Sequence, residues 1–155
     1  MREIEFRGKD IKTNEWVCGG YYKHIKRTPS PIGSNIKDED YQHLIINSGF
    51  SDWNMPKPLN CYEVDENTVG QYTGLKDKNG KKIYEGDIVK IIVFHEEFEK
   101  EIYDILYFKV FYFEEGTFFQ LENIKDNDDL DTFCGYSKDQ LEVIGNIYDN
   151  PELAK

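Results

Sequence analysis

The sequence predicts a mainly β protein with at most short helices (β-rich α+β at most), in which an N-terminal hairpin region packs with a small C-terminal barrel. Three observations support this prediction. Aromatic residues are numerous (11 Tyr, 10 Phe and 2 Trp), and they favour the half-buried surface of a pleated sheet. The pair Asn79–Gly80 is the strongest short signal for a β-hairpin. From Tyr84 onward, short apolar segments alternate with turn residues, which is the pattern of a small barrel.

The N-terminal region reads as a hairpin followed by two more strands. Ile4–Arg7 alternates apolar with charged residues, as a strand with one wet face does. A polar turn leads to a second strand over Trp16–Ile25, in which Gly19–Gly20 predicts a bulge or a close approach of another backbone. Two further strands are expected, joined by a loop over residues 48–60: Tyr41–Asn47 and Cys61–Asp65.

The C-terminal region reads as a series of strands joined by short turns. Ile88–Phe94 is a nearly continuous apolar run, so part of it should be buried on both faces. A charged turn precedes a long strand that we expect to begin near Glu101 and to end at Phe113. The remaining strands are expected over Phe118–Leu121 and Leu141–Tyr148. This pattern predicts an SH3-like barrel, whose closure would leave few open strand edges.

We predict one unit over residues 1–155, with sub-regions at 1–68 (the N-terminal β region) and 69–155 (the barrel). No segment approaches the roughly 20 apolar residues of a membrane helix, and the N-terminal residues lack the apolar run of a signal peptide. Three single cysteines, Cys18, Cys61 and Cys134, fit buried, reduced thiols better than a disulfide framework. The expectation is a soluble cytoplasmic protein with no membrane partner and no cofactor.

Charge is distributed unevenly along the chain. The net charge is −11, with +1 in residues 1–60 (9 basic, 8 acidic) and −12 in residues 61–155 (10 basic, 22 acidic). The acidic part repels a phosphate backbone and argues against ordinary DNA binding. A local basic patch remains at Lys23, Lys26 and Arg27. Two forms of nucleic-acid association stay open: direct contact through this patch, or imitation of the charge of DNA by the acidic part.

The sequence contains no recognisable catalytic motif, so we predict no enzyme and no metal. Gly74 and Gly80–Lys82 have the wrong spacing for a phosphate-binding loop and lack its hydroxyl residue. The zinc-ligand types His43, Cys61 and His95 are far apart in sequence, and only the fold could unite them. Asp126–Asp131 begins like a calcium-binding loop but ends on an aspartate where glycine is required.

Three blocks of sequence stand out by their order and spacing. The first is Ile4–Gly8 followed by Glu15–Val17, the second is VGQYTGLKDKNGKKIYEGDIV over Val69–Val89, and the third is VIGNIYDNPEL over Val143–Leu153. Together they resemble the YopX family of phage and prophage proteins. The resemblance implies a phage or prophage origin and an intracellular setting in a bacterial host. It also makes oligomers an expectation, and it implies no established activity.

Within these blocks we expect an architectural role rather than an active site. Glycines sit where turns are expected and adopt positive φ at little cost. Asp87, which follows Gly86, can bond nearby backbone amides and fix the start of a strand. The motif residues with a predicted structural role are Gly70, Tyr72, Thr73, Gly74, Asn79, Gly80, Tyr84, Gly86, Asp87, Gly145 and Asn146.

Protein binding is the function that the remaining features favour. Phe50 and Trp53 lie in a predicted proline-containing loop, where apolar side chains often serve partners; covering one end of the barrel is the alternative. The stripe Tyr107, Phe111 and Phe113 has few interleaved cations, so packing in a core or interface is favoured over stacking on nucleic acid. We therefore predict a phage accessory protein that binds another protein or itself, with an enzyme or a purely structural oligomer as the remaining hypotheses.

Overall fold

The structure, a computed structural model, describes residues 3–28, 35–97, 100–126 and 129–154. These residues form eleven strands and five short 3-10 helices, so the predicted mainly β class is confirmed. The strands pair in two antiparallel sheets, in the orders β4-β3-β2-β1-β5-β6 and β10-β9-β8-β7-β11. The residues group into two compact units, Glu3–Gln71 and Tyr72 onward, and the chain passes from one unit to the other within β5 (Gly70–Lys76).

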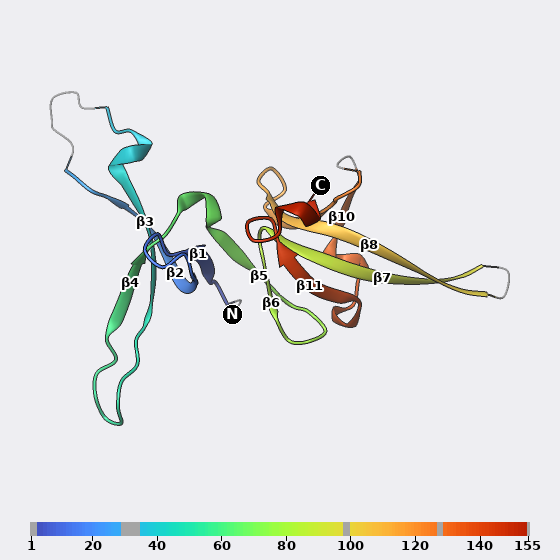
Figure 1. Ribbon diagram of the computed structural model, residues 1–155, viewed down its shortest axis with the longest axis horizontal. Coiled ribbons are helices and arrows are strands. Elements are labelled where there is room, and N and C mark those ends of the chain that lie inside the picture. Colours follow the sequence, from blue (N-terminus) through green and yellow to red (C-terminus); the bar gives the residue numbers. More distant parts are fainter. Residues whose placement is uncertain (1–2, 29–34, 98–99, 127–128, 155) are drawn as a thin grey trace. The chain divides into compact units, whose positions relative to one another are not determined.

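The first unit is built on the predicted N-terminal hairpin (Figure 1). Its strands are β1 (Phe6–Lys9), β2 (Trp16–Ile25), β3 (Tyr41–Ser48) and β4 (Leu59–Glu63), with the helices η1 (Asp38–Asp40) and η2 (Glu66–Thr68). β2 is long enough to pair first with β1 and then with β3. At the change of partner, a Cβ on Gly19 would collide with the carbonyl oxygen of Ile46. The close backbone approach predicted for Gly19–Gly20 is therefore present.

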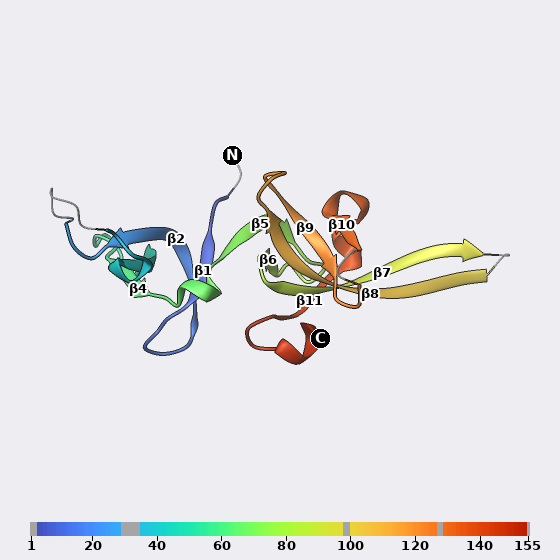
Figure 2. The same cartoon turned by 90° about the horizontal axis from the view of Figure 1, so that it is seen from above.

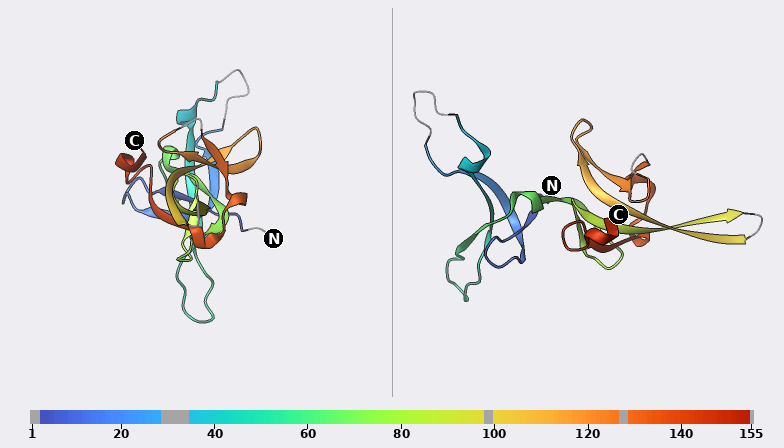
Figure 3. Two further views of the ribbon diagram at one scale, coloured as in Figure 1. Left: turned by 90° about the vertical axis from the view of Figure 1, so that its right-hand side faces the viewer. Right: turned by 45° about the horizontal axis from the view of Figure 1, so that its top comes forward.

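The second unit contains the continuation of β5 and all later elements. They are β6 (Lys82–Tyr84), β7 (Asp87–Glu97), β8 (Lys100–Phe113), β9 (Phe118–Asn123), β10 (Leu130–Thr132), η3 (Phe133–Gly135), η4 (Lys138–Gln140), β11 (Leu141–Asn146) and η5 (Pro151–Ala154). Ile88, Val89 and Ile91 are completely buried, as predicted for part of the apolar run. β7 and β8 continue as a hairpin past the other strands of this unit (Figures 2 and 3).

The closed SH3-like barrel is not confirmed. In the described part of the chain, β10 and β11 are the two outer strands of the five-stranded sheet and do not pair with each other. The hydrogen bonds that join the β5–β6 hairpin to this sheet include two from backbone amides: the amide of Val143 donates to Asp77 Oδ2 at 3.1 Å, and the amide of Lys78 donates to the carbonyl of Leu141 at 2.9 Å. A closed barrel would instead join these strands by a continuous ladder of backbone hydrogen bonds.

The three cysteines correct the prediction of buried thiols, since Cys18, Cys61 and Cys134 are all exposed. Cys18 and Cys61 lie on β2 and β4, where alternate side chains point to opposite faces and one face of the first unit meets solvent. Cys134 lies in η3. None of the described helices is long and apolar enough to cross a membrane.

Candidate functional site

The predicted basic patch lies at and just beyond the end of β2, where it meets η1. Arg27 donates to the Asp40 carboxylate from Nε at 2.7 Å and from Nη2 at 3.0 Å. This pairing, followed by a hydrogen bond from the amide of Lys37, lowers the pKa of Asp40 to about 2. Lys26 Nζ donates to the carbonyl oxygen of Glu39 at 3.4 Å. Two of the three cations are therefore engaged by η1.

The third cation of the patch, Lys23, is also engaged. Its Nζ lies 3.9 Å from Asp38 Oδ1 and 4.3 Å from the centroid of the Tyr41 ring. Asp40 and Asp38 of η1 thus lie beside Arg27 and Lys23, while Lys26 meets a backbone carbonyl. A nucleic-acid phosphate would have to compete with these carboxylates, which weakens the electrostatic attraction that non-specific binding requires.

The predicted aromatic loop connects β3 to β4 and is the most exposed apolar feature of the first unit. Trp53 is 94% exposed and Phe50 is 89% exposed. Met55 and Leu59, in and beside the same loop, are also exposed. We call Phe50, Trp53, Met55 and Leu59 the loop cluster. The structure does not use it to cover any part of its own unit.

Local hydrogen bonds give this loop a defined shape. The amide of Gly49 donates to the carbonyl of Pro58 at 2.8 Å and closes the base of the loop. The amide of Met55 donates to the carbonyl of Asp52 at 3.1 Å, and Asn54 adopts a positive φ of 65°, which completes a tight turn. A hydrogen bond at the base and a turn over residues 52–55 therefore shape the loop that carries these apolar side chains.

A polar pocket of about 320 Å³ lies beside His43 in the first unit. Four of its eight lining residues carry carboxylates, and the lining comprises Asp38, Glu39, Tyr41, Gln42, His43, Glu63, Val64 and Glu66. The sequence did not indicate this pocket, because its residues come together only when β3 pairs with β4 and η1 and η2 lie beside them. No local spacing signal could have revealed it.

Tyr21 and Glu66 flank the imidazole of His43. The Tyr21 hydroxyl lies 2.7 Å from Nδ1, and Glu66 Oε2 lies 3.0 Å from Nε2 but outside good hydrogen-bond geometry. Burial, and then the charge of Glu66, raises the pKa of Tyr21, so the phenol keeps its proton. When the Tyr21 hydroxyl donates its hydrogen bond to Nδ1, the neutral imidazole carries its own proton on Nε2, beside the pocket. Such an array can relay a proton, which is the elementary step of acid–base chemistry.

The candidate zinc ligands are not brought into one site by the described residues. His43 lies on β3, whereas Cys61 on β4 pairs with Ile46 three positions further along β3. The side chain of His95 lies outside the described residues. Among the described His, Cys, Asp and Glu residues, no group of three is suited to hold a metal ion. In the acidic loop Asp126–Asp131, residues 127 and 128 lie outside the described residues.

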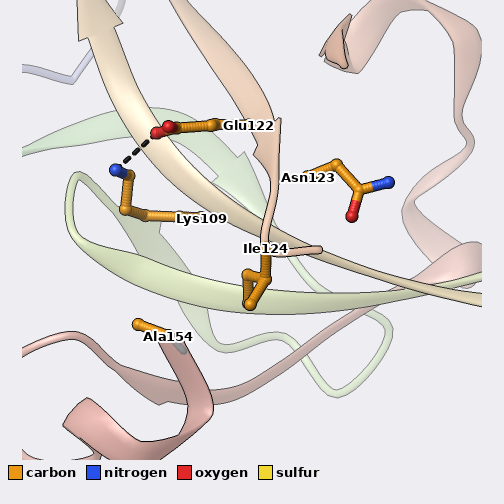
Figure 4. A pocket seen from close by; sticks show the side chains of 5 residues that line it. All are labelled: Lys109, Glu122, Asn123, Ile124 and Ala154. Carbon is orange, nitrogen blue, oxygen red and sulfur yellow. Dashed lines mark ion pairs between the residues drawn. The ribbon is translucent and has the colours of Figure 1, made fainter. Parts of the chain in front are cut away.

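Two pockets lie in the second unit and share Ile124. The smaller, of about 30 Å³, has room for about one water molecule; Figure 4 shows the ion pair between Lys109 and Glu122 on its rim, with Ala154 opposite. The larger, of about 350 Å³, is mostly apolar, and its lining is Tyr107, Ile124, Lys125, Ile144, Glu152 and Leu153. From the aromatic stripe, Tyr107 lines this pocket, while the Phe113 ring packs edge-on against Phe118 at 5.7 Å.

The first motif residues of the long block hold β5 between β1 and β6. Gly70 pairs with Arg7 of β1, and Tyr72 pairs with Tyr84 of β6. The two tyrosine rings pack with centroids 5.6 Å apart. Thr73 Oγ1 donates to the carbonyl of Ile83 at 2.8 Å.

The turn that follows is organised around a buried carboxylate. The amides of Asn79 and Lys81 both donate to Asp77 Oδ1, at 2.8 and 2.9 Å. Gly74 and Gly80 adopt positive φ values of 90° and 81°, which glycine tolerates without a Cβ clash.

The end of the block fixes the start of β7. Gly86 has a φ of 79°, and its amide donates to the carbonyl of Val110 at 2.8 Å. Asp87, which is 1% exposed, accepts a hydrogen bond from the amide of Tyr84 at 2.8 Å.

The third block closes the fold in the same way. Asn146 Oδ1 accepts hydrogen bonds from the amides of Tyr148 and Asp149, at 3.0 and 2.9 Å. The Asn150 side chain occupies the space that a Cβ on Gly145 would need. None of the predicted structural residues lines the three pockets described above, so these contacts support the fold.

Comparison with known proteins points to a family and to a shared fold. A family model described as "YopX protein" matches residues 5–155. Among solved structures, the chain is similar to the crystal structure of protein EF1440 from Enterococcus faecalis, at 22% sequence identity and a TM-score of 0.50, with 100% of each chain covered. At this identity the solved structure indicates the fold alone. The curated proteins provide no match.

Proposed function

Because the chain belongs to the YopX family, we propose that it is a phage or prophage accessory protein of the bacterial cytoplasm that acts by binding another protein. The observation that carries this proposal is the exposure of Trp53 and Phe50, at 94% and 89%, on a loop that is closed at its base by a hydrogen bond. Exposed aromatic residues are the side chains that most often anchor protein interfaces. A loop shaped by its own hydrogen bonds loses less conformational entropy on binding.

The small core of the first unit supports the same proposal. Among its described apolar residues, Ile45 and Val64 are the two with less than one tenth of their surface exposed. Small domains bury a smaller share of their surface on folding, so this unit gains little stability from apolar burial. Covering the loop cluster with a partner would therefore stabilise both the complex and the unit.

The chemistry of the loop defines the partner surface. The loop carries one acidic residue, Asp52, and one basic residue, Lys57, so charge gives little direction to binding. The partner is expected to offer an apolar recess wide enough for an indole ring. Direct nucleic-acid contact is not proposed, because Lys23, Lys26 and Arg27 engage the residues of η1.

We also propose an SH3-like arrangement for the second unit. Ile83 of β6 is part of the same buried cluster as Val89, Phe108 and Leu141 of the five-stranded sheet. The hairpin and the sheet therefore enclose one core, as the two halves of a small barrel do. Small barrels often serve as binding modules, which is an argument from fold analogy.

The test is affinity capture from a bacterial host lysate with the tagged full chain, with and without nuclease. Wild type is compared with the double variant Phe50→Ala/Trp53→Ala. The matched control is Ile11→Ala, which removes an exposed apolar side chain elsewhere on the first unit. We expect a protein that survives nuclease, is retained by the control and is lost, by roughly thirtyfold or more, with the double variant.

Two outcomes would contradict the proposal. Equal capture by the double variant would show that the loop is not part of the interface. Loss of every partner after nuclease treatment would show that nucleic acid, rather than a protein, holds the captured material to the chain. Circular dichroism of each variant verifies that the fold is retained.

A further inference from the structure

The distal part of the β7–β8 hairpin lacks strand neighbours outside the hairpin. β11 pairs with β7 only between Asp87 and Ile91, and β9 pairs with β8 only between Phe108 and Phe113. Beyond these limits, β7 and β8 pair with each other alone, from Ile92–Ile105 outward. Figures 1 and 2 show this two-stranded portion continuing past the sheet. We call it the ribbon.

The last contacts before the ribbon mark where its edges open. Gln140 Nε2 donates to the carbonyl of Ile92 at 3.2 Å, at the end of the β7 edge that β11 covers. The amide of Ile124 donates to the carbonyl of Tyr107 at 3.0 Å, at the end of the β8 edge that β9 covers. In the described residues no strand pairs with the outer edges beyond these points. An open edge presents backbone donors and acceptors that are a template for another strand.

One face of the ribbon is apolar and exposed. The register places Ile92 opposite Ile105 and Phe94 opposite Tyr103, and direct cross-strand partners share a face. Phe94, Tyr103 and Ile105 are 46%, 60% and 48% exposed. The intervening residue Val93 packs against the core of the second unit instead. A two-stranded hairpin is marginally stable in water without further packing, so this surface is suited to accept another chain.

Charge selects the kind of strand that the ribbon accepts. In the sequence, residues 92–97 and 100–106, which make up the described ribbon, contain four acidic residues and one lysine, which gives −3. Two copies of the ribbon placed edge to edge would bring like charges together, which is unfavourable. A basic segment would gain from the same charges. The edges therefore favour a foreign basic strand over a second copy of this chain.

We infer that an open edge of the ribbon binds an extended, basic segment of a partner protein whose alternate residues are apolar. Backbone hydrogen bonds to the edge would supply affinity, and contacts with Phe94, Tyr103 and Ile105 would supply selectivity. The inference rests on the proposed protein-binding function but does not use the loop cluster. The two surfaces can therefore fail independently.

The test uses the full chain and two synthetic peptides. The first alternates valine and lysine over about ten residues, which spans the ribbon at about 3.3 Å per residue. The second has the same charge but carries prolines at alternate valine positions, which removes its strand donors. Calorimetry gives the affinities, and amide hydrogen exchange locates the site. We expect the strand-forming peptide to bind at least about tenfold more tightly and to protect amides of residues 102–106 or 92–94.

Two double variants distinguish the ribbon from the loop cluster. Tyr103→Thr/Ile105→Thr keeps charge and β propensity but removes apolar contact, and it should abolish the difference between the peptides. Phe50→Ala/Trp53→Ala should leave it unchanged. Equal binding of the two peptides, or no binding of either, would overturn the inference. So would light scattering that shows a dimer of the wild type which the threonine variant loses, because the strand would then come from a second copy.

Discussion

At the scale of single residues, Asp77 joins parts of the second unit that are far apart in sequence. It is 2% exposed and accepts hydrogen bonds from the amides of Asn79 and Lys81 in its own turn and of Val143 in β11. Burial by itself raises the pKa of Asp77, but these amide donors lower it by more. The pKa of the carboxyl therefore lies below its ordinary value.

We expect Asp77→Asn to lower the free energy of unfolding by about 2 kcal/mol at pH 7, because the new amide group turns a donor toward another buried donor. The pKa of Asp77 is lower in the folded protein than in the unfolded chain, where it is about 3.9. The ionised carboxylate therefore stabilises the fold above about pH 3.9, and this stabilisation is lost as pH falls through the pKa of the folded protein. The difference between wild type and variant should thus be constant from about pH 5 to 8 and shrink below about pH 4. Urea unfolding at several pH values measures this difference in the free energy of unfolding. A difference that grows on acidification would show that the pKa of Asp77 is not lowered in the folded protein.

Asp40 offers a residue-level test of the neutralised basic patch. Its pKa should be about 2 in the wild type and should rise toward the ordinary range in Arg27→Gln, which removes the paired guanidinium. The rise should be incomplete, because the amide of Lys37 still donates to the carboxylate at 3.0 Å. Lys26→Gln is the control, since Lys26 contacts a carbonyl and not this carboxylate. A carbon-detected NMR titration of the carboxyl groups reads the values. An ordinary pKa in the wild type would show that Arg27 is available for phosphate.

At the scale of elements, the glycine turns of the second unit form a graded series. Gly86 combines a φ of 79° with a neighbour, Tyr148 Cε2, that would lie 2.9 Å from an added Cβ. Gly80 has a φ of 81° but open space around it, and Gly135 has neither constraint. We expect alanine to cost about 2–3 kcal/mol at Gly86, about 1 at Gly80 and less than about 0.5 at Gly135.

Chemical denaturation of the three variants gives the order of these costs. Equal costs at Gly80 and Gly86 would show that Tyr148 moves aside and that φ alone matters. A large cost at Gly135 would place an unseen constraint on η3. The order therefore separates backbone conformation from side-chain collision in the turn that starts β7.

Elements were predictable from the sequence where local chemistry decides them. The Asn79–Gly80 turn, the hairpin of β1 and β2, and the bond from Asp87 to a nearby amide all depend on residues close together in the chain. Barrel closure was not predictable, because it depends on whether distant edges meet. The Tyr21–His43–Glu66 array depends likewise on strand register, which local patterns do not encode. The exposure of Phe50 and Trp53 followed from their proline-containing loop, but the pairing of Arg27 with Asp40 had no local signal.

At the scale of the whole molecule, the two units differ in how much apolar surface they bury. The described core of the second unit is a cluster of eight residues: Ile83, Val89, Ile91, Phe108, Val110, Leu121, Leu141 and Val143. The first unit has Ile45 and Val64 as its buried apolar residues among those described. Since burial dominates the favourable free energy of folding, the second unit should be the more stable.

The two tryptophans make this difference measurable, because Trp16 and Trp53 both lie in the first unit. Tryptophan fluorescence then follows the first unit, while hydrogen exchange of β7 and β8 amides follows the second. We expect fluorescence to change at lower urea than the exchange of the core amides, and Asp77→Asn to shift only the latter. Coincident transitions that shift together in this variant would instead establish one cooperative unit, as the sequence predicted for residues 1–155. In that case the small core of the first unit would no longer imply that it needs a partner.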